Sequence, residues 1–143
     1  TRPRPARSVM AVTCYLTTMP GDPIRPLTIA LCQFAPRKGD VAGNLARIGR
    51  LCAQASALEP RPQVVQFPET ALSGYFVEGG VREVACTAGA LAYDLDEAYR
   101  TACAAAGLDA VPLDVVIGFY ERWRDTLHNS AAYITMGLDD GPP

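Results

Sequence analysis

The hydrophobic positions of the chain predict an alternation of strands and helices that begins near residue 27. Residues 27–34 are apolar at almost every position, as in a strand covered on both faces, and the shorter run 63–67 predicts a second buried strand. Residues 45–58 and 91–106 carry apolar side chains at helical spacing instead. Helices between buried strands form right-handed crossovers, so this order predicts an α/β fold around a largely parallel sheet.

The C-terminal part of the pattern predicts a hairpin. Residues 115–120 form a third apolar run, residues 122–126 are polar and turn-like, and residues 127–136 alternate as a fourth strand would. The fourth strand is therefore expected to lie antiparallel to the third. For the start of the first helix, Asp40 and Asn44 are equally good N-cap residues.

Residues 1–26 differ from the rest of the chain and are predicted to be a disordered extension. They hold five prolines and four arginines without a clear period. Within them, residues 10–16 are apolar, but this run is too short for a secretory signal. The folded domain is therefore expected to span residues 27–143.

The composition of the chain argues against nucleic-acid binding, membrane insertion and zinc binding. The chain has 143 residues and a net charge of −2, which gives no reason to expect binding to nucleic acid or to an acidic membrane surface. No apolar run approaches the roughly 18 residues that indicate a membrane span. The five cysteines are scattered, without the CxxC or Cys/His pairing that indicates zinc. A reducing cytoplasm fits such a set best.

Two glutamates stand at the ends of apolar runs and are the candidate acid/base groups. Glu69 lies two residues beyond Phe67, at the edge of the sheet where ligands of open α/β folds gather. Its alternative role is to cap a helix or brace a loop. Glu121 follows the third strand, and its alternative role is a surface ion pair with Arg122 or Arg124. If the two carboxylates share a site, one would move a proton while the other holds a cation.

Five further residues have simpler interpretations. Tyr75 is expected to pack with its hydroxyl at the edge of the site, and Lys38, the only lysine, to be solvated. Asn129 and Ser130 are expected to brace a turn through side-chain hydrogen bonds. Gly118 lies inside a predicted strand, which indicates that another backbone segment approaches closely there.

Several blocks of residues resemble the nitrilase superfamily of carbon-nitrogen hydrolases. The blocks follow one another in the family's order, between about residues 27 and 137. The matching residues are, in chain order, Ala30 to Phe34 with Gly39, Asp40 and Asn44, then Phe67 to Thr70 with Ser73 to Tyr75, then Val116 to Glu121 and His128 to Ala131.

This resemblance implies a fold and a chemistry. The implied fold is the α-β-β-α sandwich of the carbon-nitrogen hydrolase type, with only its N-terminal portion present here. Family members cleave non-peptide C–N bonds of amides, nitriles or carbamoyl compounds with a Glu-Lys-Cys triad, without metal or organic cofactor, and usually pair with a second copy. By resemblance, Glu69 is the triad glutamate, Glu121 is an additional glutamate that orients the lysine, and Tyr75 contacts substrate.

The chain departs from the family pattern because the lysine and cysteine blocks should follow the fourth strand. Lys38 lies in the wrong block, and no cysteine has the context of the nucleophile. Residues 27–143 are therefore expected to form a partial domain without activity of its own, from a cytoplasmic enzyme that is a homo-oligomer at full length. Two alternatives remain: the glutaminase domain of a glutamine-dependent NAD synthetase, and a non-catalytic half-domain that serves binding or assembly. An unrelated doubly wound binding domain would need a phosphate loop or a cluster of acidic residues after the first strand, and residues 33–36 supply neither.

Overall fold

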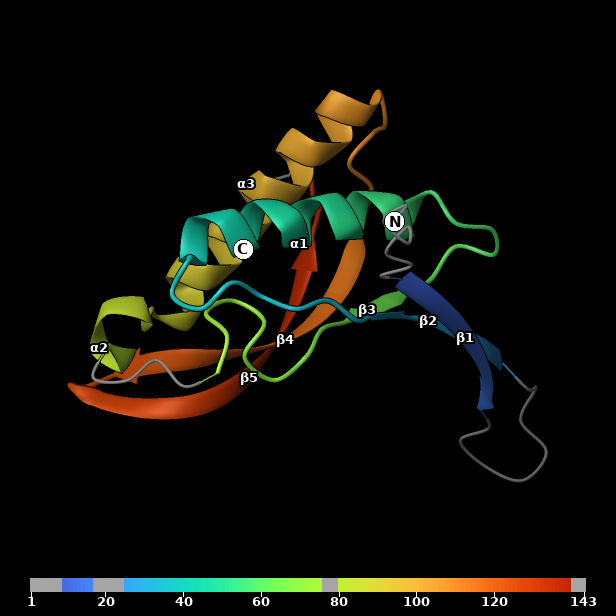
Figure 1. Ribbon diagram of the computed structural model, residues 1–143. Helices are drawn as coiled ribbons and strands as arrows, with labels where there is room; N and C mark the ends of the chain where they lie inside the picture. Colours follow the sequence, from blue (N-terminus) through green and yellow to red (C-terminus); the bar gives the residue numbers. More distant parts are fainter. Residues whose placement is uncertain (1–8, 17–24, 76–79, 140–143) are drawn as a thin grey trace, which may run out of the picture.

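One five-stranded sheet organises the computed structural model, which describes residues 9–16, 25–75 and 80–139 (Figure 1). The strands lie side by side in chain order, with parallel pairing at β2–β3 and β3–β4 and antiparallel pairing at β1–β2 and β4–β5. Their bounds are β1 (Val9–Leu16), β2 (Arg25–Cys32), β3 (Val64–Gln66), β4 (Leu113–Trp123) and β5 (Thr126–Met136).

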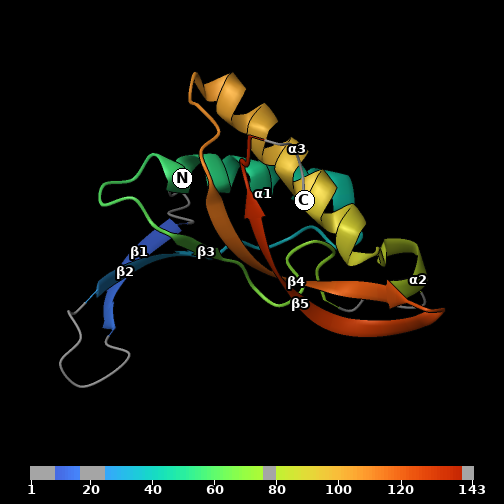
Figure 2. The ribbon, with the colours of Figure 1, turned by 180° about the vertical axis from the view of Figure 1, so that it is seen from behind.

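Two long helices cover one face of this sheet. They are α1 (Val41–Ser56) and α3 (Ala88–Ala106), and both views show them packed together on the same side, with the short α2 (Val81–Val84) near the tip of the β4–β5 hairpin (Figures 1 and 2). Val65 and Val115 face the helices and are fully buried, whereas their neighbours Val64 and Val116 face the other way and are only half-buried. In the described part of the chain, no helix covers that second face.

The N-terminus of α1 shows which of two candidate residues caps the helix. The Asp40 carboxylate accepts a hydrogen bond from the Gly43 N–H at 3.0 Å, so Asp40 is the cap. Asn44 is buried and ties loops together instead. Its amide donates to the carbonyls of Arg37 and Leu72 at 2.7 and 3.0 Å.

The predicted hairpin is confirmed, although both of its strands are longer than predicted. The register runs from Leu113 opposite Met136 to Trp123 opposite Thr126. The turn between them places two residues at positive φ, Arg124 and Asp125, as tight hairpin turns require.

The N-terminal region corrects one prediction. Residues 1–26 were expected to be disordered, but Val9–Leu16 forms β1 and pairs antiparallel with β2 along its whole length, from Val9 opposite Cys32 to Leu16 opposite Arg25. The physical reason is that an apolar, β-prone run satisfies the backbone groups of an otherwise unpaired edge strand. Residues 1–8 and 17–24 lie outside the described residues.

The α/β fold class is confirmed. The sheet with its two helices makes up one α-β layer pair of the expected four-layer sandwich. Within the described residues, no helix is both long and apolar enough to cross a membrane.

Candidate functional site

The turn that follows β3 presents Glu69. The strand ends at Gln66, and Pro68, which has no N–H to donate, stands directly before the glutamate. The Gly74 N–H then donates to the Thr70 carbonyl at 2.7 Å, with Gly74 at a φ of 75°. The turn therefore has a defined backbone conformation and holds Glu69 at the carboxyl end of a parallel strand, where α/β sheets bind ligands.

Gly118 in β4 allows this turn to lie directly on the sheet. A Cβ at position 118 would stand 1.6 Å from the Glu69 carbonyl oxygen, which no real side chain could do. The predicted close backbone approach at Gly118 is confirmed, and the segment that approaches is the one that carries the candidate base.

Two hydrogen bonds hold the Glu69 carboxylate. Asn129 Nδ2 in β5 donates to Oε1 at 2.5 Å, and the Tyr75 hydroxyl donates to Oε2 at 2.8 Å. The Asn129 bond, and then the Tyr75 bond, lower the pKa of Glu69 because both stabilise the charged form. The same carboxylate raises the pKa of Tyr75, so Tyr75 remains a neutral donor. The arrangement keeps an exposed glutamate ionised and fixes both of its oxygens.

Glu121 lies on the other face of the hairpin. Side chains alternate between the two faces of a strand, so Gly118 and Glu121, three residues apart, face opposite sides of β4. The Ser130 hydroxyl donates to Glu121 Oε2 at 2.7 Å. The structure therefore does not bring Glu69 and Glu121 together, and each has its own partner in β5.

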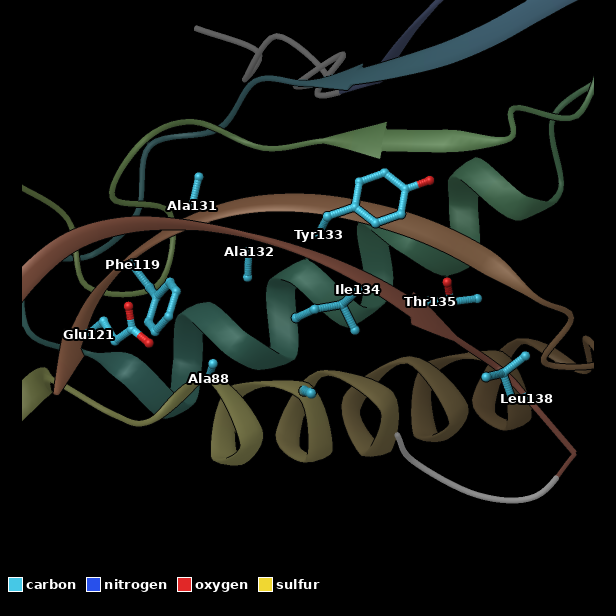
Figure 3. Close-up of a pocket in the computed structure, with 10 residues that line it drawn as sticks. Ala88, Phe119, Glu121, Ala131, Ala132, Tyr133, Ile134, Thr135 and Leu138 are labelled. Atoms are coloured by element: carbon cyan, nitrogen blue, oxygen red, sulfur yellow. The ribbon is translucent and has the colours of Figure 1, made fainter. Parts of the chain in front are cut away.

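A groove of about 500 Å³ between β5 and α3 confirms this placement of Glu121. Figure 3 shows Phe119, Glu121 and Ile134 on the side of the hairpin that faces α3, whereas Tyr133 points to the other side. The groove is otherwise lined mainly by small apolar side chains, among them Ala88, and its one carboxylate comes from Glu121.

Asn129 and Ser130 are the residues whose hydrogen-bond partners the sequence did not reveal. They were expected to brace a turn, but the turn of the hairpin lies at residues 124–125, and both residues stand inside β5. Because they are adjacent in the strand, their side chains point to opposite faces of the hairpin, where each donates to a different glutamate. The available signal was the hairpin register, because Asn129 lies opposite Tyr120 and so shares a face with Gly118.

The lysine and the cysteines do not complete a site around Glu69. Lys38 is exposed, as predicted, in a loop that borders the Glu69 turn. Burial raises the pKa of the Cys32 thiol to about 12, and it also raises the pKa values of Cys52, Cys86 and Cys103. Because the thiolate is the reactive form, none of these four cysteines has the environment of a nucleophile.

A second hollow adjoins the Glu69 turn, with a volume of about 330 Å³ at the carboxyl ends of β2 and β3. Gln33, Gln66 and Pro68 contribute to its lining. Across residues 9–16, 25–75 and 80–139, no three His, Cys, Asp or Glu side chains cluster in a way that could hold a metal ion.

Comparison with known proteins gives a family and two similar structures. Residues 28–138 match the sequence model of a family described as carbon-nitrogen hydrolase. Glutamine-dependent NAD⁺ synthetase from Acinetobacter baumannii, solved in complex with adenosine diphosphate, matches with a TM-score of 0.52 and 25% identity over 77% of this chain and 19% of that chain. No curated protein matches the chain.

The second similar structure supports the fold alone. It is a CN-hydrolase superfamily protein from Xanthomonas campestris with an arsenic adduct in its active site, at a TM-score of 0.52 and 20% identity. The match covers 74% of this chain and 38% of that chain. The chain thus spans well under half the length of either solved protein.

Proposed function

Because the chain belongs to the carbon-nitrogen hydrolase family, we propose that it supplies the general base of an enzyme that cleaves non-peptide C–N bonds by a thiol mechanism. The observation that supports this most directly is the Glu69 carboxylate. It stands at the carboxyl end of a parallel strand, and two donors hold it ionised. An ionised, fixed carboxylate is the state that a proton-accepting group must have before the reaction starts.

The proposed reaction uses a lysine and a cysteine from outside these 143 residues. Glu69 takes the thiol proton, and the thiolate attacks the carbon of an amide, nitrile or carbamoyl group. The lysine cation stabilises the negative charge that develops on the attacked group. With an amide or carbamoyl group, Glu69 then passes its proton to the leaving amine. With a nitrile, the proton goes to the nitrogen, and one water must add before ammonia leaves. In both cases a further water, activated by the same carboxylate, releases the acyl group from the thioester and the proton returns to the thiol.

The other two proposed site residues differ in how well their positions suit their roles. Tyr75 is 49% exposed and bonded to Glu69, which suits a residue that contacts substrate at the edge of the site. The role of Glu121 in orienting the lysine stays a prediction. Glu121 lies on the α3 side of the hairpin, opposite the face of Glu69, so one lysine would have to reach both faces to serve both glutamates.

The role of Glu69 is tested in a polypeptide that carries this segment together with the lysine and cysteine blocks. Replacing Glu69 by Gln keeps the shape and removes the base, so kcat on a simple amide should fall by about 10²–10⁴-fold. Glu59→Gln, at an exposed carboxylate after α1, is the matched control and should leave kcat unchanged. Full activity of E69Q would contradict the proposal.

The 143-residue chain alone is expected to be inactive, since the thiols described here are held protonated and a carboxylate cannot replace the nucleophile. The measurement is ammonia release from simple amides and from glutamine by the purified chain. Turnover above the blank that disappears in E69Q would show that this expectation is wrong.

A glutaminase role is a second candidate function, favoured by the likeness to the glutamine-dependent NAD⁺ synthetase. The longer polypeptide would then release ammonia from glutamine in preference to simple amides. A non-catalytic half-domain is the third candidate, and a stop codon directly after Pro143 would favour it over both enzymes. We also propose a cytoplasmic location and self-pairing of the longer polypeptide. The four thiols whose side chains the structure describes are free, which fits a reducing compartment.

A further inference from the structure

We infer that Asn129 is a positioning residue for Glu69: its side-chain amide fixes Oε1 as a permanent acceptor and leaves Oε2, beside the Tyr75 hydroxyl, as the oxygen that takes up and releases the proton. This inference rests on the proposed function, because it concerns how the proposed base works. It adds a role for β5 in the chemistry and an asymmetry between the two oxygens of one carboxylate.

The asymmetry follows from the chemistry of the two donors. A carboxamide N–H₂ group can only donate, so the oxygen next to it has to remain an acceptor in both protonation states. A tyrosine hydroxyl can donate or accept, so Tyr75 can turn its O–H away and accept from a proton on Oε2. The Asn129 bond at 2.5 Å therefore persists through the proton transfer, and the Tyr75 bond reverses its direction.

In the proposed reaction, the proton leaves the thiol sulfur, bonds to Oε2 and leaves a thiolate behind. Neither Asn129 nor Tyr75 gains or loses a proton. Each only keeps or turns a hydrogen bond, so the step balances within the pair of thiol and carboxylate.

The surroundings of Glu69 add few other charges. Among the described residues, Tyr120, which lies opposite Asn129 in the hairpin, is a titratable group that interacts with Tyr75. Lys38 stands in the loop bordering the turn and is exposed. Comparison with a Ser130→Ala control therefore shows whether a change in the titration of Glu69 belongs to the residue replaced.

The inference is tested by NMR titration of the carboxyl carbon of Glu69 in the 143-residue chain. Asn129→Ala should move the midpoint upward, toward the ordinary value of 4.5, because the larger of the two stabilising bonds is lost. Tyr75→Phe should give a smaller upward shift. Ser130→Ala is the matched control. It removes the neighbouring donor, which serves Glu121 on the opposite face, and should leave the Glu69 midpoint in place.

A measurement on the unaltered chain covers the case in which Asn129→Ala does not fold. The side-chain amide resonances of Asn129 should shift with pH at the Glu69 midpoint and remain those of a bonded amide below it. Amide resonances that do not respond to Glu69, or a larger shift from Tyr75→Phe than from Asn129→Ala, would overturn the inference. Neither readout needs turnover, so the inference about Asn129 can fail while the proposed function stands. The proposed function has its own test, which is the loss of kcat in E69Q.

Discussion

At position 118 the absence of a side chain is what brings the candidate base onto the sheet. An alanine there would meet the Glu69 backbone, which cannot move away as a flexible side chain could. We expect Gly118→Ala to lower the free energy of unfolding by about 1–3 kcal/mol. The displaced turn should also lose the bond between Glu69 and Asn129.

Urea denaturation measures the change in stability, and the titration of Glu69 measures the loss of the bond. Gly89→Ala is the matched control, because a Cβ at position 89 meets nothing within 4 Å in the first turn of α3. It should be neutral or stabilise the chain by up to about 1 kcal/mol. A stable Gly118→Ala variant with an unchanged Glu69 midpoint would mean that the turn has another way to lie on β4.

The lowered pKa of Glu69 makes stability depend on pH in a defined direction. The folded chain favours the carboxylate, so the Glu69 contribution is present above the unfolded value, near 4.5, and is lost as the pH falls through the lower folded value. The unaltered chain should therefore lose stability more steeply than E69Q below about pH 4.5. Thermal unfolding at a series of pH values checks this, and parallel curves for the two proteins would contradict it.

At the scale of elements, a buried carboxylate ties the end of β5 to α3. Asp96 is fully buried and accepts from Arg100 Nε at 2.6 Å and from the Gly137 N–H at 2.7 Å. The Arg100 guanidinium also donates to the Leu138 carbonyl at 2.5 Å. The cluster fixes the direction in which the chain leaves the sheet after β5.

Asp96→Ala should destabilise the chain by about 1–3 kcal/mol, since it leaves the buried Gly137 N–H without its acceptor. Asp96→Asn retains an acceptor oxygen and should cost less. Asp94→Ala, at an exposed position two residues earlier, should stay within about 0.5 kcal/mol of the unaltered chain. Equal denaturation midpoints for Asp96→Ala and the unaltered chain would mean that water replaces the lost contacts.

Helices and strands could be predicted from the sequence where the local pattern of apolar residues matches the face that packs against the core. The two long helices and the β4–β5 hairpin follow the periodicity of their apolar residues, and Gly107 ends α3 in the left-handed conformation that glycine readily adopts. β1 was missed because its apolar run is interpretable only once β2 offers a free edge. The N-cap of α1 could not be chosen because Asp40 and Asn44 differ in tertiary contacts, which a local pattern does not contain.

The candidate site was predictable in part for the same reason. Glu69 could be found because its position at the end of a strand is a property of the sequence. The separation of Glu69 from Glu121 could not, because it depends on which face of β4 each side chain meets. A register counted from the hairpin turn places Asn129 and Ser130 on opposite faces, but it does not show on which face the Glu69 turn lies.

At the scale of the whole molecule, the helix-free face of the sheet leaves apolar side chains half-exposed. Val116 lies in the centre of this face, and Tyr133 opposite it is 64% exposed. The same face carries partly buried apolar side chains from β2 and β3, namely Leu27, Ile29, Leu31 and Val64. Contiguous apolar area of this kind promotes association.

We expect the 143-residue chain to self-associate as its concentration rises, and sedimentation velocity to show larger species. Replacing Val116 and Tyr133 together by Thr should reduce this association. Tyr93→Thr, which removes an exposed aromatic from α3 instead, should not. A chain that remains monomeric at all concentrations and melts in one cooperative transition would contradict the expectation.

The adjacent placement of Asn129 and Ser130 makes the hairpin turn sensitive to length. Since neighbouring residues of β5 serve carboxylates on opposite faces, one residue inserted between Trp123 and Thr126 would move both Asn129 and Ser130 to the opposite face. His128 would then stand in the place of Asn129 beside Glu69, and Asn129 would stand in the place of Ser130 beside Glu121. Substitutions at the exposed tip are thus expected to be tolerated, whereas single-residue insertions and deletions there are expected to be eliminated by selection.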